Sequence, residues 1–319
     1  MDWSDESQGK RKGLDLRGAD LRYEDLHGLP LAKIVFSEAQ LKGTNLSSAQ
    51  LEGANLIRAR LEGANLMEAQ LKGASLSVAQ LKGANFGGAR LEGADLSSAQ
   101  LKGANLEDVF LAAEAHHMGP QLADMQWGDT NLAVVDWEQI TMLGDERVAA
   151  QKIDMDGEKK EKDERLADYK AAVRAYRQLS VELRNQGLNE DAARFAYRAQ
   201  LMQRVVFRLQ RKIGQYLFSL FLDLLAGYGY KPWRSFLAYL LVIVAFATAY
   251  FVIGHTVGPV LSPLGSFVFS MTSFHGRGFF PGGISLDDPM TVLAALEAFV
   301  GLLIEVTFIA TLTQRLFGK

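Results

Sequence analysis

Two acidic side chains stand inside one of the most apolar stretches of this chain, and they are the first candidates for chemistry. Residues 290–313 are twenty-four residues in which Glu297 and Glu305 are the only charged side chains. Carboxylates within a membrane-length apolar helix usually face the bundle interior or water. We therefore predict that Glu305 lines an aqueous cavity and attracts cations. Gly301, one turn earlier, is expected to act as a hinge or as a point of close helix packing. The residues assigned to this helix are Glu297, Gly301, Glu305, Phe308 and Leu312.

A short apolar stretch and a glycine-rich segment precede this helix. Residues 263–274 are too short to span a bilayer and are rich in small hydroxyl side chains. Residues 275–283 then read His-Gly-Arg-Gly-Phe-Phe-Pro-Gly-Gly. A short helix with an irregular continuation can enter a membrane only where protein or water satisfies its backbone. This pair of segments therefore implies an oligomer arranged around an aqueous axis.

Two stretches are long and apolar enough to carry these residues through a membrane. Residues 236–253 contain no charged side chain, and residues 290–313 contain only the two glutamates. Buried core helices are the alternative. The basic residues nevertheless fall where membrane topology needs them, because they cluster before the first stretch, recur at Arg315 and Lys319, and leave only Arg277 between. By the positive-inside rule both termini are cytoplasmic. The chain begins with a polar segment, so we expect no cleavable signal peptide.

The N-terminal part of the chain repeats every five residues. Leucine or phenylalanine occupies every fifth position from Leu16 to Leu111, twenty positions in all, and a small residue stands two places before most of them. No helix or flat strand has this period, whereas an inward leucine and an inward alanine per five residues fit a square coil. The pattern resembles the pentapeptide-repeat family, and the resemblance implies a right-handed quadrilateral β-helix. The spacing slips after Leu111 and resumes at Leu122. We therefore expect an irregular loop and then a closing coil capped by Trp127 and Trp137.

The residues of the coil suit an interaction surface, and their spacing does not indicate a catalytic or metal site. Its outward lysines and glutamates alternate, as at Lys42 and Glu52, and this mixed surface argues against mimicry of DNA. His116 and His117 have no neighbouring cysteine or carboxylate ladder, so we interpret them as loop residues. The coil is therefore expected to be a structural scaffold or a docking surface for a cytoplasmic protein partner.

Residues 157–212 have a composition that favours helix. Apolar residues recur at steps of three and four in two stretches, and between them Gly187 and Asn189 provide a helix stop and an N-cap. We predict a helical hairpin whose narrow apolar seam pairs the helices with each other or with another subunit. Residues 213–226 are too short to span and suit an interfacial helix. The basic residues expected near lipid headgroups, unless they form only a solvated face, are Arg204, Arg208, Arg211, Lys212, Lys231 and Arg234.

Residues 270–281 lie over the pattern S-x-x-T-x-T-T-V-G-Y-G-D, with agreement at Ser270 and Gly278 and an aromatic residue at Phe279. Glu297 and Gly301 match a second pattern, E-x-x-x-G. With these motifs the C-terminal part, about residues 235–316, resembles the two-helix, pore-loop channels of the potassium-channel superfamily. The resemblance implies a tetramer of this chain around the pore. It also implies a pore helix with Ser270, Thr272 and Ser273 and a filter of His275, Gly276, Arg277, Gly278 and Phe279.

The filter segment departs from that superfamily. His275, Gly276 and Arg277 replace its two threonines and its valine, so the resemblance supports a pore without potassium selectivity. A ring of Arg277 facing the axis would favour anions. Arg277 could instead pack behind the filter and pair with Glu297. We favour that arrangement because an unpaired buried charge is costly.

The composition narrows the class of protein further. The net charges are −7 for residues 1–138, +5 for residues 139–234 and −1 for residues 235–319, which gives the total of −3 and argues against a nucleic-acid partner. The chain has no cysteine, so disulfides, thiolate nucleophiles and cysteine-ligated metals are excluded. With no phosphate loop, metal cluster or nucleophile–base pair in the sequence, we expect neither enzyme activity nor a cofactor.

These patterns predict a multi-domain protein. It has a polar tail (1–13), a right-handed quadrilateral β-helix (14–138), a helical connector with an interfacial helix (139–234), and an α-helical membrane domain with two spans and a re-entrant pore loop (235–319). The expected function is an oligomeric channel for an inorganic cation in the bacterial inner membrane, with cytoplasmic β-helical rods for assembly or regulation. The alternatives are an anion-conducting pore and a membrane-anchored scaffold without conduction.

Overall fold

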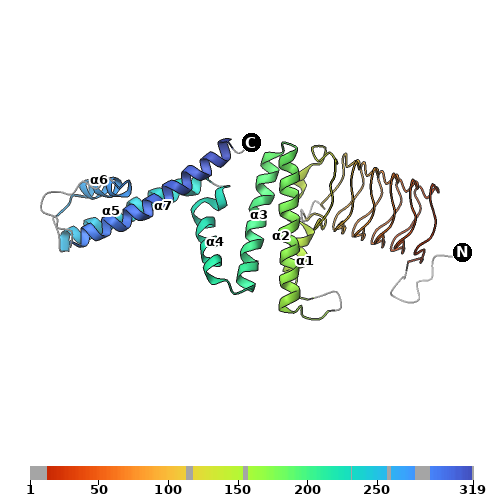
Figure 1. The fold of residues 1–319 in the computed structure, drawn as a ribbon, viewed down its shortest axis with the longest axis horizontal. Coiled ribbons are helices and arrows are strands. Elements are labelled where there is room, and N and C mark those ends of the chain that lie inside the picture. Colours follow the sequence, from red (N-terminus) through yellow and green to blue (C-terminus); the bar gives the residue numbers. More distant parts are fainter. Residues whose placement is uncertain are drawn as a thin grey trace. The chain divides into compact units, whose positions relative to one another are not determined.

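The computed structural model describes residues 13–112, 118–153, 157–230, 232–256, 260–276 and 288–317. The chain divides into two compact units, residues 1–213 and residues 214–319, and Figure 1 shows the elements of each. Each unit has hydrophobic cores of its own.

The first unit begins with a coil that returns to the same side every twenty residues. Parallel bridges join Asp15 to Val35, Val35 to Asn55 and Asn55 to Ser75, and the other sides repeat this register. Each turn of the coil therefore takes four pentapeptides, as the leucine spacing predicts. The backbone is paired between successive turns, because the N–H of Leu16 donates to the Val35 oxygen at 2.8 Å.

Each corner of the coil is a tight turn closed by one hydrogen bond. The Ala19 N–H donates to the Leu16 oxygen at 3.1 Å, and Gly18 between them has a φ of 67°. Glycine adopts this left-handed conformation without steric cost, which explains its recurrence at the corners. The central leucines and the alanines two places before them are buried along the stack, as at Leu56 and Ala54, so side chains fill the interior.

The phase slip after Leu111 is an insertion between two turns. Asp95 pairs with Gln121 and Gln100 pairs with Gln126, a spacing of twenty-six residues instead of twenty. His116 and His117 lie outside the described residues. Beyond the insertion, Trp127 and Trp137 are buried and meet edge to face, with ring centroids 6.2 Å apart.

Helices close this end of the coil. They are η1 (Trp137–Gln139), α1 (Gly144–Ala150), α2 (Lys162–Asn185) and α3 (Asn189–Leu209). The predicted hairpin is present as α2 and α3, which pack against each other. Apolar side chains of both helices belong to the same core as the leucines of the coil. The coil and the hairpin thus form one packed body.

The N-cap predicted at Asn189 is wrong by one residue. Leu188 occupies the N-cap of α3, and no side chain caps that helix. The cause is the ending of α2, where the Gly187 N–H donates to the Arg184 oxygen and the Leu188 N–H to the Leu183 oxygen. This Schellman ending uses Leu188 to close α2, so α3 begins directly after it.

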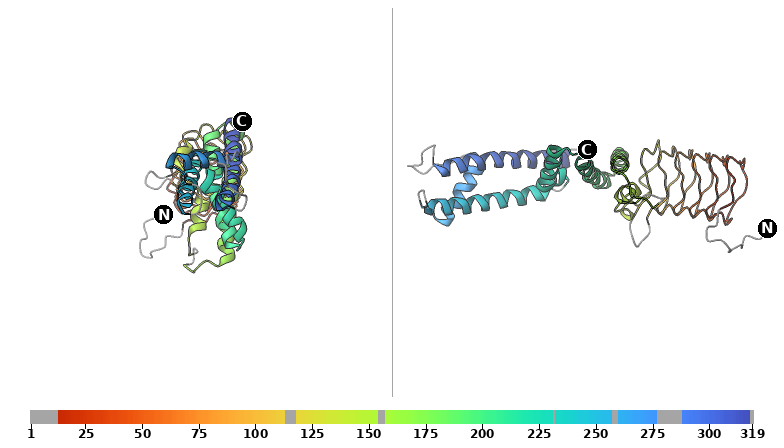
Figure 2. Two further views of the ribbon diagram at one scale, coloured as in Figure 1. Left: turned by 90° about the vertical axis from the view of Figure 1, so that its left-hand side faces the viewer. Right: turned by 90° about the horizontal axis from the view of Figure 1, so that it is seen from below.

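The second unit contains α4 (Ile213–Ala226), η2 (Gly227–Gly229), α5 (Pro232–Thr256), α6 (Pro263–Phe274) and α7 (Pro289–Phe317). Within it, α5, α6 and α7 each pack against the other two, and Figure 2 shows the two long helices running side by side. Trp233–Thr256 and Pro289–Ala310 are long and apolar enough to span a membrane. Helix α6 begins and ends at the same residues as the short apolar stretch identified in the sequence, residues 263–274.

Candidate functional site

A polar cluster lies where α5, α6 and α7 meet. It consists of Tyr250 on α5, Ser270 on α6 and Glu297 on α7, and all three residues are fully buried. The Tyr250 hydroxyl donates to Glu297 Oε2 at 2.7 Å, and Ser270 Oγ makes a short hydrogen bond with Glu297 Oε1. One carboxyl group therefore holds the short helix to both long helices.

The hydrogens of this cluster can be counted. Ser270 Oγ lies 2.9 Å from the Ile243 backbone oxygen as well as against Glu297 Oε1. A serine hydroxyl has one hydrogen and a backbone oxygen has none, so Ser270 cannot donate to both. All groups are satisfied when Glu297 carries a proton and donates it to Ser270, which then donates to Ile243. The geometry thus favours a neutral Glu297, as expected for a carboxyl that meets no cationic side chain among the described residues of an apolar bundle.

Gly301 lies one helical turn beyond Glu297, where α6 ends. A Cβ added to Gly301 would lie 2.1 Å from the Phe274 backbone oxygen and 3.1 Å from the Phe274 ring. No side chain fits at such a distance, so the end of α6 rests directly on the backbone of α7. Of the two roles predicted for Gly301, this contact corresponds to close packing, and the hinge stays a prediction.

Glu305 lies a further turn along α7 and faces His275, the residue that caps α6. Glu305 Oε1 is 3.4 Å from His275 Nε2, and the other ring nitrogen, Nδ1, is 2.8 Å from the Met271 backbone oxygen. Both side chains are partly exposed, at 40% for His275 and 38% for Glu305. Positions 297, 301 and 305 of α7 thus contact α6 at successive turns.

The structure describes the remaining predicted site residues only in part. Arg277, Gly278 and Phe279 lie outside the described residues, so the filter and the pairing of Arg277 with Glu297 stay predictions. Gly276 has a φ of 67° directly after α6, and the Thr272 hydroxyl bonds within its own helix, to the Phe269 oxygen. Ser273 is buried and Phe308 is half-buried, and the side chain of Leu312 is not described.

Tyr250 is not among the residues predicted for this site. Its hydroxyl completes the cluster around Glu297, and its ring packs edge to face on Phe269 of α6, with centroids 4.7 Å apart. A tyrosine within an apolar helix is a usable signal, because a buried hydroxyl normally finds a hydrogen-bond partner. The sequence alone could not indicate which partner it finds.

The residues of the predicted lipid-facing basic cluster differ in their exposure and in their contacts. Arg208, Arg211 and Lys212 are exposed, whereas Lys231 lies outside the described residues. Arg234 donates to the backbone and side-chain oxygens of Asp223, at 3.0 and 3.3 Å. Arg204 is half-buried and interacts within the protein. Contact of this cluster with lipid stays a prediction.

A second polar centre lies in the first unit, where the hairpin meets the last turn of the coil. The Asp145 carboxylate accepts the N–H groups of Leu122 and Ala123, at 2.7 and 3.1 Å. Burial raises the pKa of Asp145 to about 6, and these two hydrogen bonds act in the opposite direction. Burial and the charge of Glu146, whose carboxylate accepts the Tyr176 hydroxyl at 2.6 Å, raise the pKa of Tyr176 well above its usual value.

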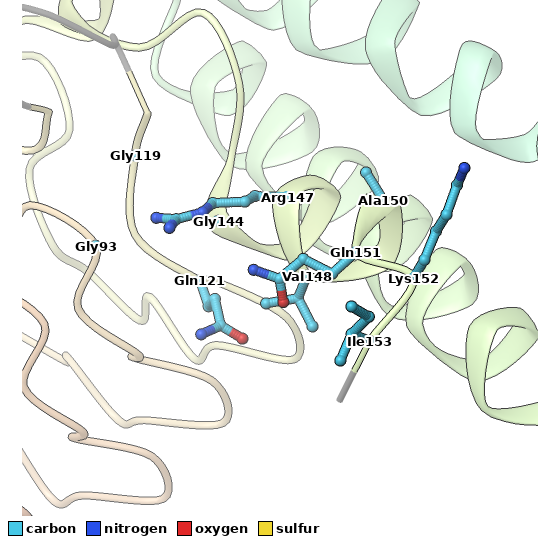
Figure 3. Close-up of a pocket in the computed structure, with 10 residues that line it drawn as sticks. All are labelled: Gly93, Gly119, Gln121, Gly144, Arg147, Val148, Ala150, Gln151, Lys152 and Ile153. Carbon is cyan, nitrogen blue, oxygen red and sulfur yellow. The ribbon is translucent and has the colours of Figure 1, made fainter. Parts of the chain in front are cut away.

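A cavity of about 770 Å³ lies beside this centre. In Figure 3 the coil contributes Gly93 and Gln121 to its wall and α1 contributes Arg147, with Gln151 and Lys152 beyond. The charged side chains in the described part of the wall, Arg147 and Lys152, are exposed rather than buried. Among the described residues no group of histidines, aspartates and glutamates is arranged to hold a metal ion. The structure therefore assigns no ligand to this cavity.

Comparison with known proteins identifies the repeat. Residues 34–73 and 74–111 match the family model of pentapeptide repeats, in eight copies. A pentapeptide repeat protein, Rfr23, from the cyanobacterium Cyanothece 51142 is 40% identical over 32% of this chain and 67% of its own, with a TM-score of 0.27. A pentapeptide repeat protein from the Arabidopsis thaliana thylakoid lumen is 24% identical over 44% of this chain and 90% of its own, with a TM-score of 0.31. No curated protein matches the chain.

Proposed function

This chain belongs to the pentapeptide-repeat proteins through its N-terminal region, and with two helices able to span a membrane at its other end we propose that it is an oligomeric ion channel. In this proposal the C-terminal units of several copies, most simply four, surround a water-filled axis. The two long helices cross the bacterial inner membrane with both termini in the cytoplasm. The β-helical rods then lie on the cytoplasmic side.

One observation supports a pore more than an anchor. Helix α6 has twelve residues, too few to span, yet it is held between both long helices through Ser270, Phe274 and His275. A pair of helices that only anchors a rod needs no third, short helix fixed between them. A short helix that ends inside a bundle can instead deliver the chain that follows it to a shared axis.

We further propose that the permeant ion is an inorganic cation, and that potassium is not selected. Glu305 is partly exposed and stands on a helix that otherwise has few charges, so its carboxylate can attract cations at the axis. The segment after α6 lacks the sequence with which potassium channels replace the hydration shell of the ion. No catalytic step and no cofactor forms part of this proposal.

The rods are proposed to assemble or regulate the channel rather than to conduct. Their interiors are filled with leucine, alanine and phenylalanine side chains, which leave no path for water or ions. Their corners and sides expose polar side chains on which a cytoplasmic protein partner could dock.

The test is reconstitution of the full chain in planar bilayers with different salt concentrations on the two sides. Discrete currents whose reversal potential shifts toward that of the cation support the proposal. A shift toward the anion reverses its ionic preference and favours Arg277 on the axis. The absence of discrete currents over a range of voltage and pH, in protein that is folded and inserted, refutes conduction and leaves a membrane-anchored scaffold.

A further inference from the structure

The contact between His275 and Glu305 differs from the buried cluster around Glu297 because both of its side chains are partly exposed. Glu297 is fully buried, whereas His275 and Glu305 are each exposed by more than a third. Histidine is the side chain that ordinarily changes charge between about pH 5 and 8. A proton can therefore enter and leave this contact while the rest of the cluster is unchanged.

The geometry defines which ring nitrogen exchanges the proton. Nδ1 of His275 lies 2.8 Å from the Met271 backbone oxygen, which only accepts hydrogen bonds, so Nδ1 carries a hydrogen. In the neutral ring Nε2 then has none, and its lone pair faces Glu305 Oε1 at 3.4 Å. Protonation places an N–H on Nε2, directed toward the carboxylate. The attraction between the two side chains is thus conditional on one proton.

The surroundings of the ring add no competing charge among the described residues. On α5 the ring of Tyr239 meets the His275 ring edge to face, with centroids 6.0 Å apart. On α6 itself Phe274 lies beside it, with centroids 5.5 Å apart. On α7 the titratable group that faces His275 is Glu305. Among the described residues, Glu305 is thus the acidic group beside the imidazole.

We propose that His275 and Glu305 form a proton-binding site that regulates the proposed channel. At low pH the imidazolium pairs with Glu305, holds the end of α6 against α7 and neutralises the carboxylate that attracts cations. At higher pH the pair separates and the carboxylate faces water. This inference rests on the proposed function for its effect on current, but the proton site itself can be tested without any current.

The first experiment measures the protonation of His275 directly. Nitrogen NMR of histidine-labelled full chain in lipid nanodiscs is recorded between pH 5 and 8, and His275→Gln identifies the signal. We expect the Nε2 signal of the protonated ring to differ between the wild type and Glu305→Gln, because its N–H is directed at a carboxylate only in the wild type. Identical Nε2 signals of the protonated ring in the two proteins overturn the proposal.

The second experiment measures current in bilayers at pH 8 and pH 5.5. We expect about a two- to tenfold larger cation current at pH 8, and we expect His275→Gln and Glu305→Gln each to remove this dependence. His255→Gln is the matched control, because the Nδ1 of His255 also lies against its own helix, 2.7 Å from the Phe251 oxygen, and no carboxylate contacts it among the described residues. The control should keep the pH dependence.

The outcomes separate the two proposals. An Nε2 signal that depends on Glu305, without current, keeps the proton site and refutes the channel. Current that is independent of pH, with an Nε2 signal that depends on Glu305, keeps the channel and refutes its regulation by this site.

Discussion

Replacement of Glu297 tests both the cluster between the three helices and its protonation state. In Glu297→Ala, Tyr250 and Ser270 lose their shared partner inside the bundle. Hydrogen bonds between membrane helices contribute about 0.6–1.7 kcal/mol each, and the loss of a packed side chain adds about 2 kcal/mol. We therefore expect Glu297→Ala to lower the free energy of unfolding of the C-terminal unit by about 3–5 kcal/mol.

Glu297→Gln is the matched variant. A glutamine amide reproduces a neutral carboxylic acid, because its oxygen accepts from Tyr250 and its NH₂ donates to Ser270. We expect this variant to stay within about 1 kcal/mol of the wild type. A carboxylate would instead have made charge-assisted hydrogen bonds, whose loss costs about twice as much as that of neutral ones.

The assay is thermal unfolding of the full chain in detergent. The two units have separate cores, so the transition of residues 1–213 serves as an internal reference. Glu297→Ala should lower the midpoint of the second transition by at least about 10 °C and leave the first unchanged. If Glu297→Gln is as destabilising as Glu297→Ala, the neutral acid is refuted. If neither variant changes the second transition, the cluster does not hold α6.

Three further predictions concern single contacts. Gly301→Ala places a Cβ 2.1 Å from the Phe274 oxygen, so we expect this variant to displace the end of α6 and to reduce the bilayer current at least tenfold. Gly214→Ala is the control, because an added Cβ there has no neighbour within 4 Å, and it should leave the current unchanged. In the folded protein the pKa of Asp145 is about 6, against an ordinary value of 3.8, so the folded state binds the proton more tightly than the unfolded state. The free energy of unfolding of the first unit should therefore fall by about 3 kcal/mol as the pH rises from about 4 to about 6. Chemical denaturation of the first unit at pH 4 and pH 7 should show this loss in the wild type and not in Asp145→Asn. Gln186 donates to the Thr130 oxygen and accepts the Leu132 N–H, so Gln186→Ala should lower the stability of the first unit by about 1–3 kcal/mol, and an unchanged denaturation midpoint would contradict this capping role.

The coil was largely predictable because its determinants are local. A leucine every fifth residue and a small residue two places earlier define both the turn and the interior, and the twenty-residue register of the bridges follows from them. Helix α6 was also predictable, since Pro263 begins it and a glycine-rich segment follows it. The N-cap of α3 was not, because it depends on how α2 ends at Gly187.

The contacts of the candidate site were only partly predictable. Apolar character indicated that Glu297 and Glu305 were unusual, but not that one would meet Ser270 and Tyr250 and the other His275. Those partners come from three helices, and their meeting depends on how the helices pack. For Gly301 the residue type indicated close packing as one of two roles, but not that the neighbour would be a backbone oxygen of α6.

The hairpin that covers the last turn of the coil also determines how this protein can vary in length. An uncovered coil presents a row of backbone donors and acceptors to which another chain could add. Here Gln178 accepts the Asp124 N–H at 3.0 Å and Gln186 bonds both Thr130 and Leu132, so side chains of α2 and of its C-cap occupy that row. Twenty residues added within the coil would lengthen it by one turn, about 4.8 Å, without altering the covered end. The rod is therefore a modular spacer, whose reach can change in steps while its attachment to the helices stays the same.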